Sequence, residues 1–170
     1  TTLLATVDSS VGGKTGVNLK AGKNLAGAFW QPSLVIFDPQ VLQSLPQHMI
    51  LDGIAETIKA GFINDKTIID EAENNLSIGD NRFLTQLAAK AVEVKRKVVE
   101  EDERDNGSRQ LLNFGHTLAH AIEKCSNYRI SHGHAVAKGM AIVSAAADEM
   151  AWTSVPCAGK ILEILKKFNF

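Results

Sequence analysis

Several residue types that mark specialised protein classes are scarce in this sequence of 170 residues. Two cysteines, Cys125 and Cys157, are too few for a disulfide framework and lack the spacing of a zinc knuckle. Eighteen Lys and Arg residues face nineteen Asp and Glu residues, without a basic run. This balance excludes the electrostatic footprint of a protein that binds nucleic acid or an anionic membrane surface.

Long hydrophobic runs are missing as well. The most apolar stretch, residues 135–152, is interrupted by Lys138, Asp148 and Glu149, so we expect no membrane span. No signal peptide is visible, and the few cysteines favour a reducing compartment, so we expect a cytoplasmic protein. The chain opens on Thr1 instead of methionine and enters a predicted strand directly. We therefore expect that an upstream segment has been removed.

What is present predicts one mainly α, multihelical domain with a short N-terminal strand and hairpin region. Residues 1–45 are expected to hold strands at Leu3–Val7 and Ser33–Asp38, with a hairpin over Val17–Phe29 that turns at Ala21-Gly22-Lys23. Residues 46–170 are expected to be helical. The predicted helices start at Pro46, Asp80-Asn81, Ser108, Gly133 and Pro156, the third of them running through Ile122 and the last two ending at Met150 and Phe168.

Crowded histidines provide the first chemical signal. His116 and His120 stand four residues apart in a helical stretch, so their rings share one face, and His132 and His134 follow soon after. Taken alone, such a pair is more often two hydrogen-bonded histidines on a polar helix face than a binding site. Glu56 sits among apolar residues of another predicted helix, where an ionised carboxylate must be paired or bound to a metal. A buried ion pair with Lys59 and metal ligation explain Glu56 about equally well. One carboxylate and two imidazoles would leave a zinc coordination position open.

The glycine-rich segment Asp8–Asn18 provides the second signal. Its Gly-Gly-Lys-Thr resembles the phosphate loop of nucleotide triphosphatases, but Asp8 replaces the required glycine and no helix can follow. Small residues there allow backbone amides to approach an anion, with charge from Lys14 and Lys23 and donors from Asn24. A plain strand exit is the alternative, and we prefer anion binding.

Four blocks together carry a resemblance to a known family. The segments Asp8–Asn18, Gly22–Phe29, Gly53–Lys59 and Leu111–Glu123 resemble, in order and spacing, the hallmark segments of the 3-dehydroquinate synthases. This resemblance covers nearly the whole chain. It implies a lyase of the shikimate pathway, which makes aromatic amino acids. Such an enzyme converts 3-deoxy-D-arabino-heptulosonate 7-phosphate to 3-dehydroquinate and phosphate, with catalytic NAD and a divalent metal, zinc or cobalt.

The resemblance also implies site residues. It assigns the metal to Glu56, His116 and His132. It assigns contacts with the small phosphorylated sugar acid to eight residues: Asp8, Lys14, Asn24, Lys59, Lys95, Arg109, Asn113 and His120. Arg109 suits a carboxylate clamp, and an ordinary surface cation is the alternative for both Arg109 and Lys14. The resemblance assigns NAD to Thr1, Thr2, Asp8, Lys14, Lys23, Val41, Leu42, Gln43 and Ser44.

Two departures from the family pattern stand out. The family usually reads His-Gly-Glu where this chain has His132-Gly133-His134, and we retain His132 as the ligand. The glycine-rich turn that grips the NAD pyrophosphate in the family is missing, so we expect residues 1–45 to be a remnant of a nucleotide-binding domain and the isolated chain to be inactive. A homodimer is expected for the full-length protein. The alternatives are another sugar-phosphate cyclase or metal-dependent alcohol dehydrogenase of the superfamily, or a non-catalytic helical fragment.

Overall fold

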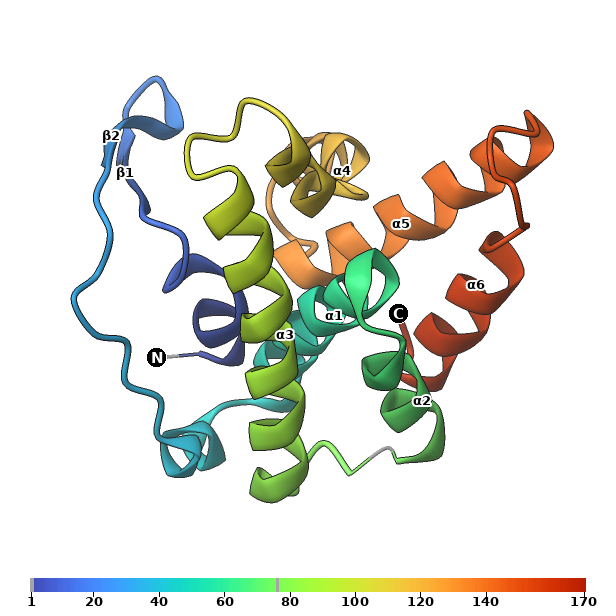
Figure 1. Ribbon diagram of the computed structural model, residues 1–170, viewed down its shortest axis with the longest axis horizontal. Coiled ribbons are helices and arrows are strands. Elements are labelled where there is room, and N and C mark those ends of the chain that lie inside the picture. Colours follow the sequence, from blue (N-terminus) through green and yellow to red (C-terminus); the bar gives the residue numbers. More distant parts are fainter. Residues whose placement is uncertain (1, 76) are drawn as a thin grey trace.

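The computed structural model, which describes residues 2–75 and 77–170 apart from the Lys23 side chain, is built around one central helix (Figure 1). This helix, α1 (Gln47–Asn64), is buried almost continuously from Asp52 to Gly61. It packs against helices α2 (Lys66–Asn74), α3 (Asn81–Glu101) and α5 (His132–Glu149). A helix enclosed on all sides must be mostly apolar, so any charged residue in it requires a partner.

The remaining elements surround this centre. Helix α4 (His116–Cys125) packs on α5, and α6 (Ala158–Lys167) packs on α5 and α2. Strands β1 (Lys14–Leu19) and β2 (Gly22–Phe29) form an antiparallel hairpin in which Thr15 pairs with Ala28. Three shorter helical segments are η1 (Ala5–Ser9), η2 (Pro39–Ser44) and η3 (Ser108–Asn113), all of which contact α3. The prediction of a mainly α domain with a hairpin is confirmed.

Both single strands predicted from the sequence are wrong. Residues 3–9 are helical instead, with Leu3 and Val7 buried in the core. Residues 34–38 form neither helix nor strand, and Leu34 and Ile36 are exposed. A strand needs a neighbour to pair its backbone groups, and the described residues offer neither segment one. Residues 3–9 meet the same need by forming hydrogen bonds within a helix.

The predicted helix from Ser108 to Ile122 is interrupted. It divides into η3 and α4 at Gly115, which has a φ of +79° and lies against α5. A Cβ atom at Gly139 of α5 would stand 2.1 Å from the Gly115 carbonyl oxygen. This close backbone contact requires glycine at both positions and fixes where α4 begins. The predicted helices at α1, α3, α5 and α6 are confirmed, whereas α2 was not predicted.

Gly139→Ala should therefore destabilise the protein. The added methyl group must push α4 away from α5, and overpacking of this kind costs about 1–3 kcal/mol. Gly159→Ala in α6 is the matched control, because nothing lies within 4 Å of its added Cβ. Removing a helical glycine there should instead raise the free energy of unfolding by up to about 1 kcal/mol. Urea denaturation measures both, and equal stabilities for the two variants would contradict the proposed helix contact.

Candidate metal and anion site

Two histidines begin helices whose N-termini meet above α1. His116 is the first residue of α4 and His132 the first residue of α5. A glycine stands beside each of them, Gly115 before His116 and Gly133 after His132. Gly133 is in close backbone contact with α1, since a Cβ atom there would lie 2.3 Å from the Asp52 Cα. These helix contacts bring both imidazoles to Glu56, which lies one turn after Asp52 on α1.

The Glu56 carboxylate divides its two oxygens between different partners. Oε2 forms an ion pair with Lys59 Nζ at 2.5 Å. Oε1 lies 3.4 Å from His116 Nε2 and 3.3 Å from His132 Nε2. Oε1 is buried and has no well-aligned hydrogen bond. The ion pair and the metal-ligand reading of the sequence are thus compatible, since each uses its own oxygen.

The geometry suits a tetrahedral zinc ion. One ligand atom from each of Glu56, His116 and His132 lies within 4.8 Å of the others. Bonds of about 2.0–2.1 Å in a tetrahedron place ligand atoms about 3.3 Å apart, which matches the two O–N separations above. Three protein ligands leave the fourth position for a bound oxygen, the arrangement typical of catalytic zinc. The orphaned Oε1 atom is what such an ion would satisfy.

Charge in the cluster is also arranged for a cation. Burial opposes ionisation of Glu56, but the Lys59 ammonium and the two histidines outweigh it and lower the pKa of Glu56 to about 2. Burial and Lys59 lower the pKa of His116, which keeps its ring neutral. Contact with the Glu56 carboxylate raises the pKa of His132, so a proton competes with a metal for that nitrogen.

A cavity of about 330 Å³ opens beside the two imidazoles, and we call it the central cavity. Its lining includes every residue that the resemblance assigned to substrate: Asp8, Lys14, Asn24, Lys59, Lys95, Arg109, Asn113 and His120. The resemblance did not assign four other lining residues: Ser9, Val11, Asp105 and Leu112. Residues from η1, the hairpin, α1, α3, η3 and α4 thus meet at one place.

The cations of the central cavity are held by specific partners. Lys95 donates to the Asp8 carboxylate at 2.6 Å, and Lys14 pairs with Asp105. Arg109 is only 3% exposed, and its two terminal nitrogens donate to the carbonyl oxygens of Gly12 and Glu103 at 2.7 and 2.6 Å. The surface-cation alternative is therefore wrong for Arg109, whereas the Lys14 side chain is half exposed.

Asp105 escaped the sequence analysis because it ends a charged run that is typical of a solvated surface. It lines the cavity and pairs there with Lys14, which is 91 residues away in the sequence. His134 points elsewhere: its Nδ1 lies 3.3 Å from the Asp52 carboxylate, and its ring packs edge-on against Phe170. Residues two apart at a helix start face different directions, which separates His134 from the metal cluster.

The residues assigned to NAD are more dispersed. Asp8 and Lys14 line the central cavity, but Thr2, Val41, Leu42, Gln43 and Ser44 do not. Leu42 is buried, and Gln43 lines a separate cavity beside Ile50 and Leu84. Thr1 and the Lys23 side chain lie outside the described part of the chain. The structure therefore does not bring the complete NAD set together.

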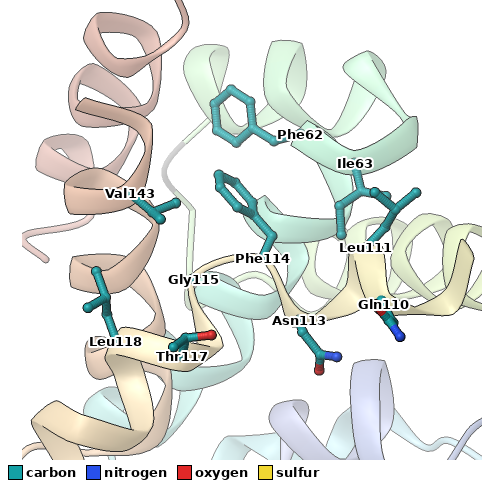
Figure 2. A pocket seen from close by; sticks show the side chains of 10 residues that line it. All are labelled: Phe62, Ile63, Gln110, Leu111, Asn113, Phe114, Gly115, Thr117, Leu118 and Val143. Carbon is teal, nitrogen blue, oxygen red and sulfur yellow. The ribbon is translucent and has the colours of Figure 1, made fainter. Parts of the chain in front are cut away.

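A larger, apolar cavity of about 670 Å³ lies between the end of α1, η3, α4 and α5. Figure 2 shows the rings of Phe62 and Phe114 facing one another across it, while the Asn113 amide points away. No titratable side chain is among its lining residues in the described part of the chain. Its described lining therefore supplies no acid or base to the site.

Known proteins resemble this chain in both sequence and structure. A family profile described as "3-dehydroquinate synthase C-terminal" matches residues 53–170, and one described as "3-dehydroquinate synthase N-terminal" matches residues 1–52. The 3-dehydroquinate synthase of Clostridium perfringens strain 13 is 46% identical over 99% of the chain, and that of Corynebacterium jeikeium is 49% identical over 82%. The chain covers 49% and 39% of these relatives, so it spans about half their length or less.

Solved structures agree with the sequence comparisons. A 2-deoxy-scyllo-inosose synthase complexed with carbaglucose-6-phosphate, NAD+ and Co2+ superposes with a TM-score of 0.89 at 28% identity, over 99% of this chain and 47% of that one. The 2-epi-5-epi-valiolone synthase of Streptomyces hygroscopicus subsp. jinggangensis 5008, with NAD+ and Zn2+ bound, superposes with a TM-score of 0.86 at 25% identity, over 98% of this chain and 48% of that one.

No described helix is both long and apolar enough to cross a membrane. With the profile matches over its full length, the chain belongs to the 3-dehydroquinate synthase family.

Proposed function

We propose that this chain supplies the metal- and substrate-binding part of a 3-dehydroquinate synthase. Such an enzyme converts 3-deoxy-D-arabino-heptulosonate 7-phosphate to 3-dehydroquinate and phosphate, using NAD and a divalent metal. The observation that carries the proposal is the buried, unsatisfied Glu56 Oε1 facing two imidazole nitrogens at the wall of a cavity lined by cations. Identities of 46–49% with named synthases, against 25–28% with the related cyclases, favour this substrate over theirs.

Glu56, His116 and His132 would hold the metal, zinc or cobalt as in the two related cyclase structures. When bound, the metal supplies Lewis-acid polarisation of a substrate oxygen, and NAD supplies hydride transfer. Lys59 keeps Glu56 ionised, so the ligand set carries one negative charge toward the ion. Neutral His116 then needs to lose no proton before it binds.

The central cavity suits an anionic substrate once the metal charge is added. Three of its lysines, Lys14, Lys59 and Lys95, are each balanced by a carboxylate, whereas Arg109 is held only by carbonyl oxygens in the described contacts. Arg109 therefore keeps an uncompensated charge and further N–H donors for a substrate carboxylate. Asn24 and Asn113 line the same cavity and offer amide groups for hydroxyls, and His120 is assigned to proton or phosphate handling.

The wider assignments are proposals of the same kind. Residues 1–45 are proposed as part of a nucleotide-binding unit and residues 46–170 as the helical metal and substrate unit. For NAD we retain Thr1, Thr2, Asp8, Lys14, Lys23 and residues 41–44, of which Asp8 and Lys14 reach the central cavity. A homodimeric, cytoplasmic enzyme is proposed for the whole protein.

His116→Ala tests the metal centre directly. The parent chain should retain about one zinc ion after dialysis, and the variant should retain none, because two ligands remain in place of three. His48→Ala is the control, since His48 is exposed near the start of α1. Metal analysis of the three proteins measures the stoichiometry. Full zinc retention by His116→Ala would show that the ion, if bound, uses other ligands.

Lys59→Met tests whether Lys59 is the counter-ion of Glu56. Breaking a buried ion pair leaves an uncompensated charge and costs about 3–5 kcal/mol, so the metal-free variant should lose stability on this scale. The double variant Glu56→Gln/Lys59→Met should recover much of the loss because no buried charge remains. Zinc should also restore part of the stability of Lys59→Met, since the ion replaces the missing positive charge. Urea denaturation with and without zinc checks this, and additive losses in the double variant would refute the pairing.

The stabilisation from Glu56 also depends on pH. Its pKa is lowered from 4.5 to about 2 by folding, so its contribution is complete above pH 4.5 and is lost as the pH falls toward 2. Acid titration of the parent chain without metal should therefore show a loss of stability between these pH values that Glu56→Gln/Lys59→Met lacks. Identical acid profiles for the two proteins would contradict the lowered pKa.

A further inference from the structure

Glu123 is a buried carboxylate that the proposed function leaves unused. It lies near the end of α4 and is 7% exposed. Its Oε2 atom stands 3.4 Å from Nδ1 of His132, the first residue of α5. A carboxylate at such a depth is costly unless it serves a partner, and an imidazole N–H is one.

The spacing along α4 explains how Glu123 reaches this position. His116, His120 and Glu123 stand at positions i, i+4 and i+7, so they form one stripe on the helix. The rings of His116 and His120 lie 5.3 and 6.4 Å from the His132 ring, centroid to centroid. One face of α4 is therefore turned toward His132.

The two nitrogens of His132 face different carboxylates. Nε2 lies 3.3 Å from Glu56 Oε1 at the metal position, and Nδ1 faces Glu123. A neutral imidazole carries one proton, and the nitrogen that binds a metal must be the unprotonated one. Ligation through Nε2 therefore requires the proton on Nδ1. There the N–H can donate a hydrogen bond to a carboxylate.

We propose that Glu123 is a positioning residue for the metal centre, which holds the His132 ring in the Nδ1–H tautomer and in the orientation that aims Nε2 at the ion. This inference rests on the proposed function, because it needs a metal at Glu56, His116 and His132. Carboxylate partners of this kind orient a histidine ligand and raise its basicity. Glu123 also ties α4 to the first turn of α5, so it fixes His132 relative to His116.

The other histidine ligand is supported differently. His116 Nδ1 lies 3.3 Å from the carbonyl oxygen of Phe114, a backbone group two residues before it. The Phe114 ring lies in the apolar cavity of Figure 2 and anchors that backbone segment. His116 thus has a support that does not involve Glu123, so we expect variants of Glu123 to change the metal site at His132.

The experiment compares Glu123→Ala and Glu123→Gln with the parent chain. Competition with a chromophoric chelator measures the zinc dissociation constant, and the visible spectrum of bound Co2+ reports ligand geometry. Glu123→Ala should weaken zinc binding about 10–100-fold, the usual effect of removing such a partner. Glu123→Gln should weaken it less, because its amide oxygen still accepts the Nδ1 proton. Glu149→Gln, at the exposed far end of α5, is the control and should match the parent.

The Co2+ spectrum and the circular dichroism of the metal-free protein separate a positioning role of Glu123 from a merely structural one. Positioning predicts that Glu123→Ala shifts the Co2+ spectrum, while circular dichroism of the metal-free variants stays that of the parent. If Glu123→Ala fails to fold, the zinc affinity of Glu123→Gln decides. An unchanged dissociation constant in the folded Glu123 variants, with binding still abolished by His116→Ala, would overturn the role of Glu123 and leave the metal centre intact. A parent chain that binds no zinc would overturn both.

Discussion

The charge of Glu56 is the constraint on which the site depends. A charged carboxylate in a helix buried on all sides needs compensation from other groups. Its desolvation alone would cancel a large part of the free energy of unfolding of a domain. Two kinds of group compensate this charge: Lys59, one turn away on the same helix, and two imidazoles from other helices. The ion pair leaves one carboxylate oxygen unused, and that oxygen defines the metal position.

The helix contacts that deliver the imidazoles are equally specific. Both histidines begin a helix next to a glycine, and each glycine allows a backbone approach that no side chain would permit. These close contacts restrict where each helix can start, which suits a metal that tolerates only small errors in ligand position. The same packing that gives the domain its core thus sets the ligand geometry, and the two cannot be altered independently.

Local sequence patterns were sufficient where the chain makes its own contacts. Helical periodicity and the caps around Asp80 located the long helices, and the turn predicted at Ala21-Gly22-Lys23 located the hairpin, although the observed turn is at Lys20-Ala21. The strand predictions at Leu3–Val7 and Ser33–Asp38 failed because branched residues favour a strand only where a neighbouring strand exists to pair with it. The break at Gly115 was missed for a similar reason, since the contact with Gly139 that requires it lies in a different helix.

The site shows the same division between local and distant information. The conspicuous spacing of His116 and His120, and a carboxylate among apolar residues at Glu56, were enough to raise the hypothesis of a metal centre, and family resemblance selected His132 over His134. Asp105 and Glu123 gave no comparable signal, because an acidic residue in a charged run or on a helix face is usually solvated. Glu123 did stand seven residues after His116 in the pattern of one helical stripe, so its orientation toward α5 was available once α4 was known to begin at His116. A sequence therefore reveals metal ligands more readily than the groups that orient them, since ligands are restricted to a few residue types while an orienting group needs only a suitable acceptor in the right place.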